Sequence, residues 1–506
     1  MKRQLSTKTK AQWRGYLACW VYLCFLFTIH LFGVPATGYT DIAPWKYRSF
    51  IAAAALFCFV LVCVLIDYRL DGNRMGAWRP VRKQELPLIG YLLFTALSAL
   101  VSQYSGVFWG NTRQEGAFTI SLYVLTAVLF SRYFRPAKWI PWLVGSAVSL
   151  FCLFGLIQFA GGNPLTLFPQ GYQYHHADIY FLGKYWSTVG NAGLCVALLV
   201  MAVGLFFVGF IRGNKSRMWA SIPLFLAIFC IVELEGEAGI LALLVGIPLL
   251  LPVCIRSCGE LSRAAAGVAL MLAAVGCAQL LVFEAAGVTL SLRSSILSYA
   301  GVLLCIGVSC VLRRLHREIP AAVLQKNIAV AVASLFLAGV LVLALYDGVP
   351  AGFLQEAQQL LRGNWNDDFG SGRLYIWRRV LELVPQAPLF GGGPDTLGLR
   401  GIAWKPTLHP VLGVEVTTEI DAAHNELLHI LVNQGALALL AYLAVLVRAL
   451  LCWWKNRQEL YRLMCGAAVL FYLLQSLFGI SSPVSAPFFW MALGCLMSDS
   501  KQENLK

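Results

Sequence analysis

Long apolar segments recur along the whole of this 506-residue chain, and they constrain its fold more than any other feature. A helix that crosses a lipid bilayer needs about 20 mostly apolar residues, with a range of about 17–25. We therefore predict an all-α polytopic membrane protein with about fourteen transmembrane helices. The candidate segments, of which the last is the shortest, are 15–33, 50–66, 86–102, 116–131, 140–160, 190–210, 218–234, 237–254, 264–283, 294–312, 327–346, 424–448, 463–480 and 485–498.

The composition excludes the main classes of water-soluble protein. Apolar residues make up 59% of the chain and charged residues only 13%, whereas soluble domains carry about 25% charged residues. A soluble protein of this length needs several charged domain surfaces, which this composition does not supply. Soluble enzymes, disordered scaffolds and nucleic-acid-binding proteins are therefore poor interpretations, although the net charge is +14. In a membrane protein, such an excess reflects cationic loops on the cytoplasmic side.

The distribution of Lys and Arg predicts the orientation. With a cytoplasmic N-terminus, the inner segments hold 28 of the 39 Lys and Arg residues and the outer segments hold 11. We expect both termini in the cytoplasm, and a first transmembrane helix rather than a signal peptide because no small-residue cleavage site follows it. The chain then divides into a membrane region 1–346 with about eleven helices, a large extracytoplasmic loop 347–423, and a membrane region 424–506 with about three helices.

Neither a resident metal nor a cofactor is expected. The 15 cysteines are an odd number, they lie in or beside apolar segments, and none lies in the long loop, which argues against a disulfide framework. Cys254 and Cys258 lack the second pair or histidines that a zinc site requires. No nucleotide-binding loop is present, so we expect no ATP-driven transport by this chain itself.

The long loop contains a short helix predicted over 372–384, with Ser371 as a candidate N-cap. One side of this helix is apolar, and Arg373 is the only charge on that side. A guanidinium that faces a buried surface needs an anionic partner. The partner is either a phosphate held by the bidentate fork of the arginine or a carboxylate of the chain, and snorkelling toward water is a third possibility. The carboxylates that lie close in sequence are Asp367, Asp368 and Glu382.

A second cluster of polar residues opens the apolar segment 424–448. Asp421 is a candidate N-cap, which would place His424 in the first helical turn at the outer membrane boundary. A polar stripe of Asn425, His429 and Asn433, with Glu426 beside it, continues into the membrane, and such residues normally face a cavity or another helix. His424 is predicted to project roughly opposite to this stripe. It is either a base or an ordinary hydrogen-bonded boundary residue.

These two segments together resemble the bacterial O-antigen ligase and O-antigen polymerase family. The resemblance implies metal-independent transfer of a glycan from an undecaprenyl-diphosphate carrier to an acceptor hydroxyl at the outer face of the bacterial cytoplasmic membrane. The acceptor is a lipid-anchored sugar in ligases and another repeat unit in polymerases. The likeness is carried by residues 372–377 (Gly-Arg-x-x-x-Trp), 388–394 (Pro-Leu-Phe-Gly-Gly-Gly-Pro) and 421–429 (Asp-x-Ala-His-Asn-Glu-x-Leu-His), with weaker echoes at 109–116 and 188–191.

The resemblance also implies roles for individual residues. His424 would be the general base on the acceptor hydroxyl, and Asn425 would orient the histidine or the acceptor. Arg373 would bind the leaving diphosphate, and Arg378 on the same helix is a further candidate for substrate binding.

The chain departs from the family at one position. Family members commonly carry a second arginine at an outer turn, where this chain has Glu237. Arg113 is a candidate replacement, held by Glu237, although this glutamate is also typical of a solvated turn.

Two other classes of function remain as alternatives. A flippase for lipid-linked oligosaccharides would need charged residues deep within several membrane helices and related halves. A solute or ion transporter would use the glutamates at 233, 235 and 237, which lie at a predicted turn rather than in mid-membrane. The concentration of polar groups at the outer boundary favours a membrane-embedded glycan transferase, whose partners are a lipid-linked donor, a glycan or lipid-anchored acceptor, and membrane lipids, with no nucleic acid.

Overall fold

The computed structural model describes residues 7–70, 81–160, 162–167, 187–213, 217–284, 287–290, 292–314, 318–350, 352–405, 407–408, 415–417 and 419–498. Within these ranges the chain is almost entirely helical. The helices are α1 (Thr7–Phe25), α2 (Ile42–Leu70), α3 (Leu86–Val101), α4 (Ala117–Tyr133), α5 (Ile140–Phe159), α6 (Ala192–Arg212), α7 (Arg217–Glu233), α8 (Glu237–Cys254), α9 (Cys258–Leu280), α10 (Leu292–Arg314), α11 (Ala321–Leu345), α12 (Phe353–Leu361), α13 (Arg373–Leu381), α14 (Glu426–Asn456), α15 (Leu460–Ser476) and α16 (Ala486–Leu496).

Two short antiparallel hairpins interrupt this helical pattern. The first pairs β1 (Leu281–Glu284) with β2 (Gly287–Leu290), and the second pairs β3 (Thr407–Leu408) with β4 (Glu415–Val416). Neither hairpin was predicted. Helix α1 continues directly into one turn of π-helix, Leu26–His30.

The apolar segments of the sequence form helices. Eight helices in the described ranges are long and apolar enough to cross a membrane, and six more are apolar but shorter, at 10–17 residues. Each of the fourteen predicted segments overlaps one of these helices. The prediction of an all-helical multi-pass membrane protein is therefore confirmed, whereas the count of fourteen crossings stays a prediction.

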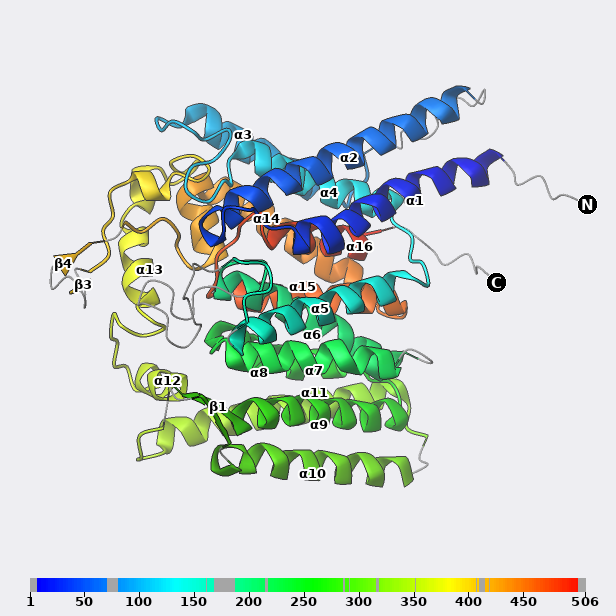
Figure 1. The fold of residues 1–506 in the computed structure, drawn as a ribbon, viewed down its shortest axis with the longest axis vertical. Helices are drawn as coiled ribbons and strands as arrows, with labels where there is room; N and C mark the ends of the chain where they lie inside the picture. Colours follow the sequence, from blue (N-terminus) through cyan, green and yellow to red (C-terminus); the bar gives the residue numbers. More distant parts are fainter. Residues whose placement is uncertain are drawn as a thin grey trace, which may run out of the picture.

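The helices stack side by side into a bundle whose centre is α6 (Figure 1). Within its most apolar 18-residue window, 83% of the α6 residues are buried, and this helix contacts α7, α8, α9 and α15. In α11, by contrast, none of the corresponding window is buried although its mean hydropathy is 2.8. An apolar helix that leaves its side chains uncovered by protein is suited to a lipid environment.

The segment between α11 and α14 lies at one end of the bundle. Helices α12 and α13 and the β3–β4 hairpin sit at the end opposite to the start of α1 (Figure 1). The short helix predicted over 372–384 is present as α13, over Arg373–Leu381. The prediction of Ser371 as its N-cap is wrong, because Gly372 occupies that position with no side-chain cap.

A break in α14 attaches this segment to the bundle. Gly435 has a φ of 84°, and a Cβ atom there would lie 2.2 Å from the carbonyl oxygen of Leu389. The glycine-rich stretch 388–393 packs against this break in α14. The Gly393 N–H donates to Asn433 O at 2.7 Å, and the Ala436 N–H donates to Pro388 O at 2.9 Å. Only a residue without a side chain fits so close a backbone approach.

Helix α14 also begins later than predicted. Asn425 is its N-cap, and the Asn425 side chain accepts the Leu428 N–H at 3.0 Å. The prediction that Asp421 caps this helix is wrong, because the Asp421 carboxylate pairs with Arg113 instead. His424 therefore precedes the helix rather than lying in its first turn.

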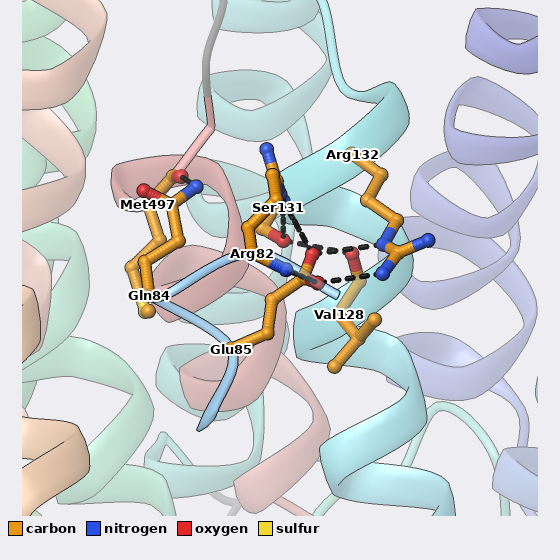
Figure 2. A network of polar contacts seen from close by, with 7 residues as sticks. All are labelled: Arg82, Gln84, Glu85, Val128, Ser131, Arg132 and Met497. Carbon is orange, nitrogen blue, oxygen red and sulfur yellow. Dashed lines mark hydrogen bonds and ion pairs between the residues drawn. The ribbon is translucent and has the colours of Figure 1, made fainter. Parts of the chain in front are cut away.

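A buried carboxylate just before α3 links the start of α3 to the end of α4 (Figure 2). The Glu85 side chain is 1% exposed and pairs with Arg82 and with Arg132 of α4, each at 2.6 Å. Burial raises the pKa of Glu85, but the hydrogen bonds from Arg132 and Arg82 outweigh that effect and lower it to about 2. The network fixes the start of α3 against the end of α4.

We predict that Glu85→Gln destabilises the protein by about 3–5 kcal/mol, because it leaves two arginines without their shared partner. Thermal unfolding in detergent measures this. Glu382→Gln makes the same change in an exposed pair with Arg379 and should alter stability by at most about 1 kcal/mol. Equal melting temperatures for the two variants would contradict the account.

The same network predicts how acid affects stability. Because the folded pKa of Glu85 is depressed, its contribution is fully present above the ordinary carboxyl pKa and is lost as the pH falls toward about 2. Unfolding experiments should show the difference between wild type and Glu85→Gln shrinking as the pH falls below about 4.

Candidate functional site

Four of the six predicted site residues line one cavity of about 320 Å³. Arg113 comes from the loop before α4, Glu237 from the start of α8, Arg373 from the start of α13, and His424 from the segment before α14. We call this the large cavity. Its wall also includes Asn191, Ser371, Glu235 and Gln475.

A strained turn positions Arg373. Gly370, Ser371 and Gly372 all have left-handed backbone conformations, with φ of 64°, 57° and 78°. A Cβ atom at Gly372 would lie 2.3 Å from the Trp404 ring, so that position requires glycine. The turn brings Arg373 toward the bundle, where its Nε donates to the carbonyl oxygen of Phe478 at 2.9 Å.

The carboxylates that lie near Arg373 in sequence all pair with other cations. Asp367 pairs with Arg378, Asp368 pairs with Lys405, and Glu382 pairs with Arg379, at 2.5–2.6 Å.

Arg373 itself makes no ion pair within the described ranges and bonds only to backbone carbonyls. Burial lowers its pKa, while the charges of Glu237 and Glu356 raise it. An internal ion pair within the described ranges therefore does not account for this partly buried guanidinium.

Asp395 holds the loop that carries Arg113. Its carboxylate accepts backbone N–H groups from Asn111 at 2.5 Å, Arg113 at 3.1 Å and Glu115 at 3.3 Å. Burial raises the pKa of Asp395, and these N–H donors oppose the rise.

The Arg113 guanidinium pairs with Asp421 at 2.7 Å. The prediction that Glu237 holds Arg113 is therefore wrong: Asp421, 308 residues away, is its partner, and the charge of Glu237 acts on Arg373.

His424 is held neutral beside the two arginines. Its backbone is left-handed, with a φ of 48°. Burial, together with the charges of Arg373 and Arg113, lowers the pKa of the imidazole to about 4, although Asp421 opposes this shift. At neutral pH the ring is therefore uncharged and able to accept a proton.

The remaining predicted residues lie away from the large cavity. Asn425 caps α14 with its side-chain oxygen. The Arg378 side chain is 59% exposed in its pair with Asp367. It lines neither the large cavity nor the two smaller cavities described next.

Two further cavities meet at His424. The side cavity, about 280 Å³, shares Ser371, Arg373 and His424 with the large cavity and adds Trp404, Glu419 and Asp421. The inner cavity is far smaller, about 10 Å³, and is lined by polar residues that include Arg113, Glu426 and His429. The prediction that His424 projects away from Glu426 and His429 is therefore wrong, because all three line the inner cavity.

Sequence reasoning missed several residues of this site. Asp395 follows the glycine-rich stretch, and no local pattern indicates that it would hold a loop about 280 residues away. Phe478 contributes a backbone carbonyl, which leaves no trace in the sequence. Glu426 was recognised only as part of a polar stripe, although a carboxylate two residues after a candidate base is a signal worth weighing.

The fold and the site define a class of protein: a multi-pass helical membrane protein with a polar cavity that holds a neutral histidine between two arginines. The sequence model of the family described as O-antigen ligase matches residues 280–443, which include α13 and His424. This match confirms the resemblance to the O-antigen ligase family over the part of the chain that carries α13 and His424. A search of curated proteins found no match. The match to this family supports glycan transfer of the ligase or polymerase kind.

We predict that the His424 imidazole titrates near pH 4 and that Arg373→Gln raises its pKa, because removal of a nearby positive charge favours the imidazolium. Nitrogen NMR of the histidine-labelled protein in detergent measures both values, with His424→Gln assigning the signal. Arg379→Gln removes an exposed charge from the same helix and should leave the pKa unchanged. An ordinary value of about 6.5 in the wild type would refute this description.

Proposed function

We propose that this protein transfers a glycan from an undecaprenyl-diphosphate carrier to an acceptor hydroxyl. The observation that carries the proposal is the convergence of Arg373, Arg113 and His424 on the large cavity, together with the lack of an ion-pair partner for Arg373 among the described residues. A diphosphate is the anion that two guanidinium groups of this kind are suited to bind. The family match over residues 280–443 supports the same type of reaction.

In this proposal the large cavity binds the donor. Arg373 and Arg113 hold the diphosphate, and their positive charges stabilise the negative charge that develops on it as it leaves. Because the guanidinium groups are fixed before the reaction by Phe478 O and by Asp421, little reorganisation is needed. The reaction needs no metal ion, since the two arginines supply the positive charge.

His424 acts as the general base. The neutral imidazole removes the proton of the acceptor hydroxyl, and the oxygen then forms a bond to the anomeric carbon of the donor sugar. The bond from that carbon to the diphosphate breaks, and its electron pair stays on the leaving diphosphate. Proton removal by a positioned base is worth about 10²–10⁴-fold in rate.

The side cavity is the proposed acceptor site. It meets the large cavity at Arg373 and His424, so an acceptor bound there would reach the base. Trp404 offers an aromatic face on which a sugar ring can stack, and the carboxylates of Glu419 and Asp421 can accept hydrogen bonds from sugar hydroxyls.

The resemblance implies an arginine where this chain has Glu237, and we propose a different role for this glutamate. With Glu235 it forms a carboxylate edge of the large cavity, opposite in charge to the diphosphate site. We propose that this edge accepts hydroxyl groups of the donor sugar, while Arg113 serves as the second diphosphate ligand. The arrangement keeps the positive charge where the phosphates lie.

The setting follows from the same proposal. Helix α13, whose Arg373 lines the large cavity, lies at the end of the bundle opposite to the start of α1 (Figure 1). With the cytoplasmic termini that we propose, this end is at the outer face of the bacterial cytoplasmic membrane. A ligase would use a lipid-anchored sugar as its acceptor, and a polymerase would use a second lipid-linked repeat unit. The chemistry at His424 is the same in both.

We predict that His424→Ala and Arg373→Ala each lower glycan transfer by at least about 10²-fold, since one removes the base and the other removes charge stabilisation. Transfer is measured in proteoliposomes supplied with lipid-linked donor and acceptor. Arg379→Ala removes an exposed arginine from the same helix and should keep wild-type activity. Normal transfer by either site variant, with the protein correctly inserted, would contradict the proposed roles.

A further inference from the structure

Glu426 and Arg113 both line the inner cavity, and each has one buried polar atom without a hydrogen-bond partner among the described residues. The Glu426 side chain is 94% buried, and one of its carboxylate oxygens accepts the Tyr442 hydroxyl at 2.6 Å. Its other oxygen, Oε2, has no hydrogen-bond partner among the described residues, and neither does the Nε–H of Arg113. Buried polar groups in folded proteins are nearly always satisfied, so an unpaired acceptor and donor on one cavity require an explanation.

The size of the inner cavity supplies one. About 10 Å³ is open to the centre of a water molecule, which is enough for one water. A single water there can accept the Arg113 Nε–H and donate to Glu426 Oε2, which satisfies both atoms. His424 lines the same cavity, so its ring lies beside this water.

His424, as the proposed base, needs a group that takes its proton after each transfer. Once His424 has removed the acceptor proton, it is an imidazolium in a buried site beside two arginines, whose charges disfavour it. The proton must leave before the next turnover. Apart from His424, the titratable residues on the inner cavity are Arg113, Glu426 and His429, and the His429 ring nitrogens already contact the Asn433 side-chain amide. Glu426 is the one with a free acceptor atom.

We propose that Glu426 acts through His424, taking the proton that the histidine removes from the acceptor by way of one water in the inner cavity. This rests on the proposed glycan transfer. The acceptor O–H bond breaks as an N–H bond forms on one imidazole nitrogen. The N–H bond on the other nitrogen then breaks, its proton passes to the water, and the water gives a proton to Glu426 Oε2. The histidine returns to its neutral form, the water is regenerated, and Glu426 ends as a carboxylic acid.

The first test compares Glu426→Gln with Glu85→Gln. Glu85 is also a buried carboxylate, but it pairs with Arg82 and Arg132 just before α3 and lines none of the three cavities. We expect Glu426→Gln to lower kcat 10- to 100-fold while KM for the lipid-linked donor stays within twofold, and folded Glu85→Gln to change neither by more than twofold. Equal losses in both variants, or a kcat above half of wild type in Glu426→Gln, would overturn the inference.

The second test distinguishes proton acceptance from a structural role. Formate is a small carboxylate that can occupy the space left by Glu426→Ala, and we expect it to restore transfer in that variant. Failure of formate to restore any activity in a folded Glu426→Ala protein would count against a proton acceptor.

A third measurement uses the unmodified protein and so does not depend on how the variants fold. Single-turnover rates are measured in mixtures of H₂O and D₂O. Plotted against the fraction of D₂O, the rate should fall along a curved line, because more than one proton moves in the rate-limiting step. A straight line would contradict relay through water. If His424→Ala also retained transfer, the proposed function itself would fail, whereas loss in His424→Ala with full activity in Glu426→Gln would remove only the role of Glu426.

Discussion

The positive charge of Arg373 is the constraint on which this account of the protein depends. The guanidinium is partly buried at the start of α13, yet the three acidic residues nearest to it in sequence are paired with Arg378, Lys405 and Arg379. A charge in such a position is costly unless something compensates it. Within the described ranges its hydrogen bonds go only to the backbone carbonyls of Gly370 and Phe478, and the proposed function assigns the remaining compensation to a diphosphate in the large cavity.

Long-range contacts build the rest of the site around that charge. Asp395 holds the Arg113 loop through backbone N–H groups, and Asp421 fixes the Arg113 guanidinium from just before His424. The broken helix α14 receives the glycine-rich stretch 388–393, so the loop segment and the membrane bundle share one framework. The same two arginines that would bind a diphosphate also hold the His424 imidazole in its neutral form, so anion binding and base strength are linked.

The sequence predicted the apolar helices and α13 because these depend on local length and periodicity. The predicted N-caps of α13 and α14 were both wrong. Ser371 lies in a turn of three left-handed residues, and the Asp421 carboxylate pairs with Arg113, 308 residues away. The partner of Arg373 could not be chosen from the sequence, since the choice depended on where Asp367, Asp368 and Glu382 point. Asp395 and Glu426 were missed as functional groups because only the folded chain brings them to Arg113.

The most direct test of this account is an experimentally determined structure of the protein with a non-reactive lipid-diphosphate donor analogue. We expect phosphate oxygens within hydrogen-bonding distance of the guanidinium groups of both Arg373 and Arg113, with the sugar directed toward His424. A diphosphate bound away from the large cavity, or Arg373 still bonded only to backbone carbonyls in the complex, would contradict the central claim.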